Sequence, residues 1–173
     1  MKPLFLYAGK HPLLAAAKIT REERAVIYRA LDVKMVKDIT PGDPKAERAA
    51  VLDSEISDIV LAENGSRQVM VLGPKTFCGT GGCPIHIFVR QNGQLRLAFG
   101  GGANGLTIRK TVTKGYHDFA THWRFGATDN VYSVYRWTGH EYKAIDCYYA
   151  TFNTDDQKVP TINSCKRSPT PSN

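Results

Sequence analysis

The chain has 173 residues, of which 42% are hydrophobic and 23% are charged, a composition close to that of an ordinary globular domain. Its apolar stretches are interrupted every few residues, so we expect no transmembrane helix, which needs about 20 consecutive apolar residues. The sequence lacks a phosphate-binding loop, a dinucleotide fingerprint, a nucleophile elbow and an H-E-x-x-H metal motif. The enzyme classes that those motifs identify are therefore excluded.

The chain is basic, with 23 Lys and Arg residues against 16 Asp and Glu residues and a formal net charge of +7. A basic surface attracts nucleic acids, anionic lipids or acidic proteins. The basic residues are dispersed, and their densest cluster is the short pair Lys166 and Arg167, whereas nucleic-acid modules concentrate them beside stacking aromatic residues. The pattern therefore predicts a protein partner, such as an acidic enzyme or toxin, and no nucleic acid.

Residues 1–18 are set apart as an N-terminal segment with some features of an export signal. A basic start, an apolar stretch and an A-x-A site at Ala15–Ala17 are typical of such signals, but Lys10 and His11 interrupt the apolar stretch. Two alternatives follow: a natural signal was replaced by Met1, or the protein has none.

Two helices are predicted next. Thr20 followed by Glu23 is a capping box, which predicts a helix over about residues 21–31. Asp43 and Pro44 are typical of a second helix start, and apolar residues then recur at steps of three and four. These residues are Ala49, Leu52, Ile56, Ile59 and Val60, so the second helix is expected to run to about Ala62.

From Gly65 onward, apolar residues alternate with polar ones, which predicts short strands. The expected strands lie at 69–71, 85–89, 95–99, 106–112, 119–125, 131–137 and 142–149. Asn92-Gly93 and Thr138-Gly139-His140-Glu141 predict tight hairpin turns. The expected fold class is α+β, with two N-terminal helices packed on an antiparallel meander sheet of about six or seven strands. Residues 19–152 would form this single domain, and residues 153–173 a C-terminal tail tethered by Cys165.

The four cysteines favour two local disulfides, Cys78 with Cys83 and Cys147 with Cys165. One alternative is a zinc site that uses Cys78, Cys83 and His86, but its C-x4-C spacing is marginal and no second cysteine pair follows. A catalytic thiol is another alternative, since His86, His117, His122 and His140 could each supply a base. We expect disulfides, no metal and no cofactor.

Three segments and the closing hairpin also carry a resemblance. They are Pro44–Asp53 (with Arg48, Leu52 and Asp53), the loop Cys78-Gly79-Thr80-Gly81-Gly82-Cys83-Pro84, the run Gly115-Tyr116-His117-Asp118-Phe119, and the hairpin Tyr135–Tyr142. Together, over roughly residues 43–145, they resemble a loose group of small exported proteins of Gram-negative bacteria, mostly uncharacterised. The resemblance implies an α+β fold and a periplasmic or secreted location. The expected disulfides imply the same location, because they persist in oxidising compartments. It brings no catalytic residues with it.

These observations favour a non-enzymatic extracytoplasmic binding protein, such as an inhibitor or immunity protein against an envelope-targeting enzyme. The candidate binding residues are the aromatic side chains Tyr116, Trp123, Tyr135 and Trp137, because Tyr and Trp are favoured at interfaces. The alternative for each is a cross-strand pair in the core.

Two further functions stay open from the sequence. The first is a secreted hydrolase that uses His117, Asp118 and His122, with Asp146 or Glu141 further along the chain. The second is an envelope component that grips glycan where Gly100–Gly102 permits close approach, although such a glycine run is also typical of a bulge or sharp turn.

Overall fold

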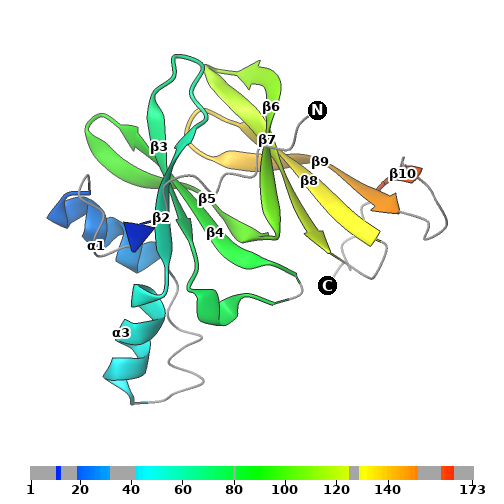
Figure 1. The fold of residues 1–173 in the computed structure, drawn as a ribbon. Helices are drawn as coiled ribbons and strands as arrows, with labels where there is room; N and C mark the ends of the chain where they lie inside the picture. The colour runs from blue at the N-terminus through cyan, green and yellow to red at the C-terminus, as the bar shows by residue number, and fades with distance from the viewer. Residues whose placement is uncertain are drawn as a thin grey trace, which may run out of the picture.

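Two antiparallel sheets, rather than one, make up most of the protein (Figure 1). The structure is a computed structural model that describes residues 11–12, 19–31, 42–79, 81–124, 129–151 and 161–165. Within these ranges, ten strands form two five-stranded sheets with the orders β1-β2-β3-β4-β5 and β10-β9-β8-β7-β6. Neighbours in each sheet are consecutive in the chain, so each sheet is an antiparallel meander.

The first sheet consists of β1 (His11–Pro12), β2 (Glu55–Val60), β3 (Arg67–Leu72), β4 (Cys83–Gln91) and β5 (Gln94–Ala103). The second sheet consists of β6 (Gly105–Thr113), β7 (Tyr116–Arg124), β8 (Asp129–Trp137), β9 (Tyr142–Thr151) and β10 (Thr161–Ser164). The described helical elements are α1 (Arg21–Ala30), α3 (Pro44–Leu52) and the short 3-10 helix η2 (Lys75–Phe77).

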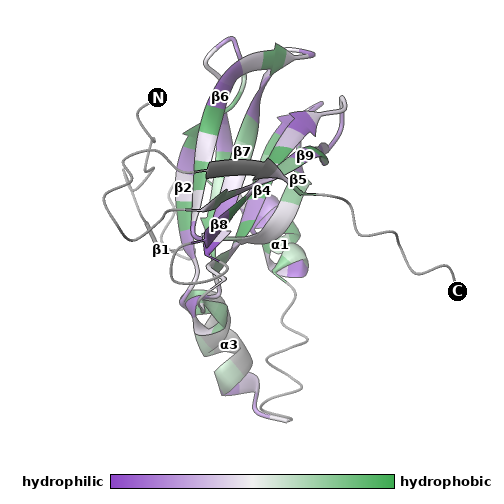
Figure 2. Cartoon of the chain, turned by 90° about the vertical axis from the view of Figure 1, so that its right-hand side faces the viewer, coloured by the Kyte–Doolittle hydropathy of each residue, from purple (hydrophilic) through white to green (hydrophobic). Residues whose placement is uncertain are grey.

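The main core lies between the two sheets. Figure 2 shows hydrophilic and hydrophobic bands along strands such as β6, the pattern of a strand with one buried face. Phe99 of β5 contacts Phe119 of β7 edge to face, with ring centroids 5.1 Å apart, and also contacts Tyr135 of β8. Phe119 is fully buried, and burial of such a side chain stabilises the fold by about 1.5–3 kcal/mol.

A smaller core lies on the other face of the first sheet, under α1. Ile27 and Leu31 are fully buried there against Val71 and Phe88. The predicted capping box is confirmed: the Thr20 hydroxyl accepts a hydrogen bond from Glu23 N, and the Glu23 carboxylate accepts one from Thr20 N. In Figure 1, α1 lies beside the first sheet on the side away from the second sheet. The order of layers is therefore helix, sheet, sheet.

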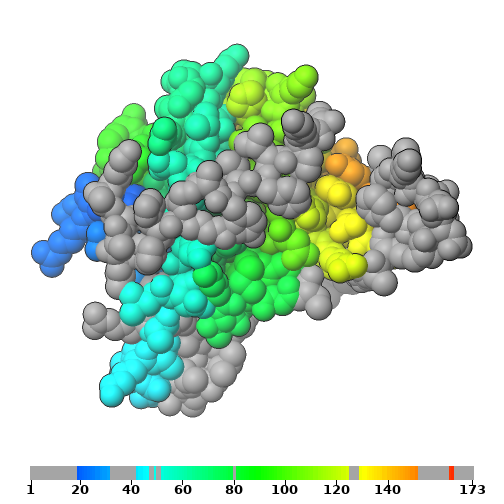
Figure 3. All heavy atoms as spheres, viewed as in Figure 1, coloured from blue at the N-terminus to red at the C-terminus, as the bar shows by residue number. Residues whose placement is uncertain are grey.

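The predicted α+β class, with two helices covering one sheet of six or seven strands, is wrong. The fold is mostly β, and its strands divide between two sheets that pack on each other. The break falls at Asn104, between the end of β5 and the start of β6, where Asn104 N donates to His122 O at 2.8 Å. Figure 3 shows α3 projecting at the edge of the molecule. The sequence pattern predicts the successive strands of a meander, but it does not predict where the strands divide between two sheets.

The predicted extent of the second helix is also wrong. This helix ends at Leu52, and residues Glu55–Val60 form β2 instead. Ile56 faces α1, whereas Ile59 faces the second sheet, so the two side chains lie on opposite faces of the strand. Both faces of this sheet are buried, so apolar residues three apart are compatible with a strand and imitate helical spacing.

Of two local features expected of the β-strands, one is confirmed and one is wrong. Asn92 and Gly93 both have positive φ (52° and 75°), as the predicted tight turn between β4 and β5 requires. The predicted bulge or sharp turn at Gly100–Gly102 is wrong: the run lies within β5 and pairs in register with Pro84–His86 of β4. A Cβ on Gly101 would be 2.9 Å from the Phe99 ring. This glycine is therefore explained by core packing.

Several predicted features lie outside the described residues. They are most of the N-terminal segment 1–18, the C-terminal tail apart from residues 161–165, and the Lys166-Arg167 pair.

Candidate functional site

Four tight turns lie at one end of the molecule, which we call the turn end. They join β2 to β3 (residues 63–66), β4 to β5 (92–93), β6 to β7 (114–115) and β8 to β9 (138–141). Because each sheet is an antiparallel meander, alternate connections must fall at the same end. Loops that a rigid scaffold positions are where binding residues are disproportionately found.

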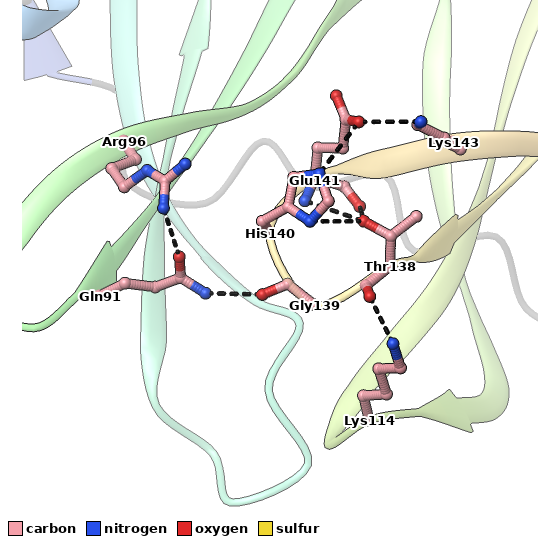
Figure 4. Close-up of polar contacts among 8 residues, drawn as sticks. All are labelled: Gln91, Arg96, Lys114, Thr138, Gly139, His140, Glu141 and Lys143. Carbon is pink, nitrogen blue, oxygen red and sulfur yellow. Dashed lines mark hydrogen bonds and ion pairs between the residues drawn. The ribbon is translucent and has the colours of Figure 1, made fainter.

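Hydrogen bonds connect these turns, both across the two sheets and within the second sheet. Glu63 N donates to Gly115 O at 2.9 Å, and the Lys114 ammonium donates to Thr138 O at 2.6 Å. The Gln91 side chain donates through Nε2 to Gly139 O at 3.0 Å (Figure 4). These hydrogen bonds therefore link the turns into one continuous surface.

The turn at 138–141 is the centre of this arrangement. Thr138 N donates to Glu141 O at 2.9 Å, and the Thr138 hydroxyl both donates to Glu141 O and accepts from Glu141 N. Gly139 has a φ of +117°, a conformation that L side chains rarely adopt. These features hold the next side chains, His140 and Glu141, in a defined position.

The charged groups of the turn end surround this turn (Figure 4). The Glu141 carboxylate lies 3.2 Å from Lys143 Nζ and 3.3 Å from His140 Nε2. The hydrogen bond from Lys143 is the main reason that the pKa of Glu141 lies below its usual value, so this carboxyl is ionised at neutral pH. Arg96 donates from Nη1 to Gln91 Oε1 at 3.2 Å, which links it to the same turn.

The predicted aromatic binding residues divide into a buried group and one exposed residue. Trp137 is buried, and Tyr116 and Tyr135 pack against the main core, which is the alternative that the sequence left open for them. Trp123 is 39% exposed on β7, with its ring 4.0 Å from a Cβ placed on Gly81. Trp123 thus lies near the Cys78–Cys83 loop and away from the turn end.

The predicted hydrolase residues do not form a catalytic group in the described structure. Asp118 accepts from the hydroxyls of Thr111 (3.0 Å) and Thr113 (3.3 Å) and from Arg136 (3.1 Å), and its side chain is only 1% exposed. His122 lies four residues further along the same strand, about 13 Å away at the usual rise of about 3.3 Å per residue. His117 contacts Arg109 O through Nδ1. Asp118 is thus satisfied by a structural network and is out of reach of His122.

Two histidines lie in environments that disfavour their charged form. Burial lowers the pKa of both His86 and His122 below the usual value. The His122 ring packs beside Tyr132, which in turn stacks on Tyr148 with centroids 4.9 Å apart. Because the faces of the two tyrosine rings are turned toward each other, they do not form a flat platform for a ligand.

All four cysteines form disulfides, Cys78 with Cys83 and Cys147 with Cys165, as the sequence predicted. In this form they supply neither the thiolates of the alternative zinc site nor a catalytic thiol. Across the described side chains, no group of three or more His, Cys, Asp or Glu residues could hold a metal ion. Two disulfides are typical of a protein that folds in an oxidising compartment.

Sequence reasoning missed the polar residues that connect the turns, namely Gln91, Arg96, Lys114 and Thr138. The turn signals at 92–93 and 138–141 were recognised, but nothing local in the sequence says that these turns meet. That information lies in the strand order and in the packing of one sheet on the other.

None of the described helices has the length and apolar composition needed to cross a bilayer. No protein-family model, curated protein or solved structure matches the chain. The resemblance to small exported proteins of Gram-negative bacteria therefore stays a prediction.

Proposed function

We infer that this protein is a non-enzymatic extracytoplasmic binding protein that engages a protein partner through its turn end. The observation that carries this proposal is the set of hydrogen bonds that holds separate turns as one surface. Glu63 N donates to Gly115 O and Gln91 to Gly139 O across the sheets, and Lys114 donates to Thr138 O within the second sheet. A surface that is ordered before binding loses less conformational entropy on association, so its contacts yield more affinity. An inhibitor or immunity protein against an envelope-targeting enzyme is the functional class that such a surface suits.

The two disulfides support an extracytoplasmic location, periplasmic or secreted. The paired cysteines are five and eighteen residues apart in sequence. Disulfides form and persist where the environment is oxidising. Cys147–Cys165 also ties β10 to β9, and Cys165 N donates to Cys147 O at 2.9 Å.

The hydrolase alternative has no comparable support. Of its three residues, Asp118 is occupied by Thr111, Thr113 and Arg136, and neither histidine contacts it in the part of the chain that the structure describes. Binding is therefore the function that the geometry supports best.

The experiment is capture of a partner by the tagged chain from an envelope extract of its native organism. A single stoichiometric partner is expected to bind the wild type and to be lost from Gln94→Trp, which adds bulk to an exposed position beside the 92–93 turn without changing the charge. Thr76→Trp, exposed in η2 near the opposite end, is the matched control and should retain the partner. Recovery of the clean monomer from repeated extracts, or equal binding by Gln94→Trp and wild type, would contradict the proposal.

A further inference from the structure

Four basic residues of the described structure each form an ion pair with a carboxylate. The pairs are Arg67 with Asp58, Lys75 with Glu55, Arg90 with Glu23 and Arg136 with Asp118. In each of them the positive charge is largely cancelled at short range. Such residues add little to the field that an approaching anion meets.

Two cations of the turn end are held differently. Lys114 donates to the backbone carbonyl of Thr138 at 2.6 Å, and Arg96 donates to the neutral amide of Gln91 at 3.2 Å. Neither lies in an ion pair in the described part of the protein. Both cations are therefore positioned by hydrogen bonds and yet keep their full charge.

The two cations converge on one turn. Lys114 Nζ lies 3.7 Å from a Cβ placed on Gly139, and Gly139 O accepts the amide of Gln91, the same side chain that holds Arg96. Lys143 lies at the other side of this turn and shares the Glu141 carboxylate with His140 (Figure 4). Arg96 and Lys114 thus flank a turn whose one carboxylate, Glu141, already pairs with Lys143.

We propose that the turn end binds an acidic protein surface, with Arg96 and Lys114 each facing a carboxylate of the partner. The inference rests on the proposed function, because it describes the partner of that same surface. Charge complementarity selects the partner: cations held by neutral acceptors can accept an external carboxylate without first breaking an internal ion pair. Among the described residues, the tyrosine and tryptophan nearest to the turns, Tyr116 and Trp137, pack in the core and are not offered for the stacking contacts that a single-stranded nucleic acid would need.

The test measures the binding of fluorescein-labelled poly-L-glutamate by fluorescence anisotropy. Wild type is compared with Arg96→Gln/Lys114→Gln, in which glutamine keeps a hydrogen-bond donor at both positions and removes two charges. The matched control is Arg21→Gln/Lys45→Gln, which removes two charges from exposed positions in α1 and α3. Arg96→Lys/Lys114→Arg restores both charges, and thermal unfolding of each variant confirms that it is folded.

The proposal predicts that Arg96→Gln/Lys114→Gln weakens binding about tenfold, whereas the control stays within about twofold and the charge-restoring variant binds like wild type. Wild-type affinity should fall as salt shortens the Debye length from about 30 Å to about 8 Å. Equal weakening by both double variants would overturn the proposal, since net charge alone would then explain binding. Tight binding of heparin with none of polyglutamate would also overturn it and would assign the surface to sulfated or phosphorylated polymers.

Failure of this inference is distinguishable from failure of the proposed function. Gln94→Trp blocks the surface without changing its charge, so loss of partner capture in that variant supports the binding surface by itself. Suppose that Gln94→Trp loses the partner but Arg96→Gln/Lys114→Gln captures it as wild type does. The turn end is then supported as the binding surface, and the inference that the partner is acidic is contradicted.

Discussion

At the scale of single residues, Asp118 is the one charged residue that is buried among those the structure describes. Its carboxylate is buried on β7, accepts hydrogen bonds from two threonine hydroxyls of β6 and pairs with Arg136 of β8. A buried carboxylate destabilises the fold unless its lone pairs are satisfied, and this one is. Its role is therefore to fasten three strands of the second sheet, immediately below the turn end.

Replacing this carboxylate by its amide tests that role. Asp118→Asn is expected to lower the free energy of unfolding by about 2 kcal/mol, because charge-assisted hydrogen bonds become neutral ones. Arg136 is about half exposed and keeps much of its hydration, which limits the loss. Urea denaturation measures the change, and Asp58→Asn in the exposed pair with Arg67 is the control, with an expected change below about 0.5 kcal/mol. Equal effects at the two sites would contradict the structural role of Asp118.

Two partly buried histidines, His86 and His122, predict how stability depends on pH. Burial lowers the pKa of His86 and His122 in the folded state, so the unfolded chain takes up protons first, near pH 6.5. The free energy of unfolding should therefore be constant above about pH 7 and fall as the pH drops below about 6.5. Glu23 and Glu141 have lowered pKa values and act in a more acidic range, below their ordinary value of 4.5.

Urea denaturation between pH 7.5 and pH 5 measures this slope. His122→Phe, which keeps a ring beside Tyr132, combined with His86→Asn should flatten it. An unchanged slope in the double variant would show that other groups are responsible.

At the scale of elements, the turns are the best predicted features and the second helix is the worst. Asn92-Gly93 and Thr138–Glu141 are turns because their chemistry is local: positive φ at Asn92, Gly93 and Gly139, and a threonine hydroxyl that closes the loop. Residues Glu55–Val60 were assigned to a helix because the sequence cannot reveal that both faces of β2 are covered. Turn residues can be recognised from a few neighbouring positions in the sequence. Burial of both faces of a strand depends on elements elsewhere in the chain, so the local sequence does not show it.

Gly139 provides a prediction at this scale. Gly139→Ala forces an L residue to a φ of +117° and is expected to cost about 1–3 kcal/mol in the free energy of unfolding. Because Gly139 O accepts the Gln91 amide, the same change should also speed hydrogen exchange in the 91–94 turn. Gly102→Ala is the control: its added Cβ would lie 4.0 Å from the nearest atom, so little change is expected. An equal stability loss in both variants would contradict the strain argument.

At the scale of the whole molecule, what the sequence could not provide was the arrangement of the sheets. The cysteine pairs were predictable because their spacing is local, but the division of the meander at Asn104 was not. The turn end depends on that division, since Gln91 reaches Gly139, and Glu63 reaches Gly115, only once the sheets have packed. The candidate site was therefore present in the sequence only as separate turns.

The disulfides provide a prediction for the whole chain. Cys147→Ser/Cys165→Ser, which opens a link across eighteen residues, should lower the free energy of unfolding by about 3 kcal/mol. Cys78→Ser/Cys83→Ser opens a link across five residues and should lower it by about 2 kcal/mol. Intact mass after denaturing alkylation checks the starting state: no thiol of the wild type should react until a reductant is added. Four reactive thiols without reductant would remove the basis for an extracytoplasmic location.

The central claim is that the turn end is the binding surface, and hydrogen–deuterium exchange of the chain with and without its captured partner tests it most directly. The account predicts that bound partner slows exchange in peptides covering residues 63–66, 91–96, 114–116 and 138–143, with little change in the Cys78–Cys83 loop and in α3. Protection centred on the Cys78–Cys83 loop and Trp123, with none at the four turns, would contradict the account and place the interface at the opposite end of the molecule.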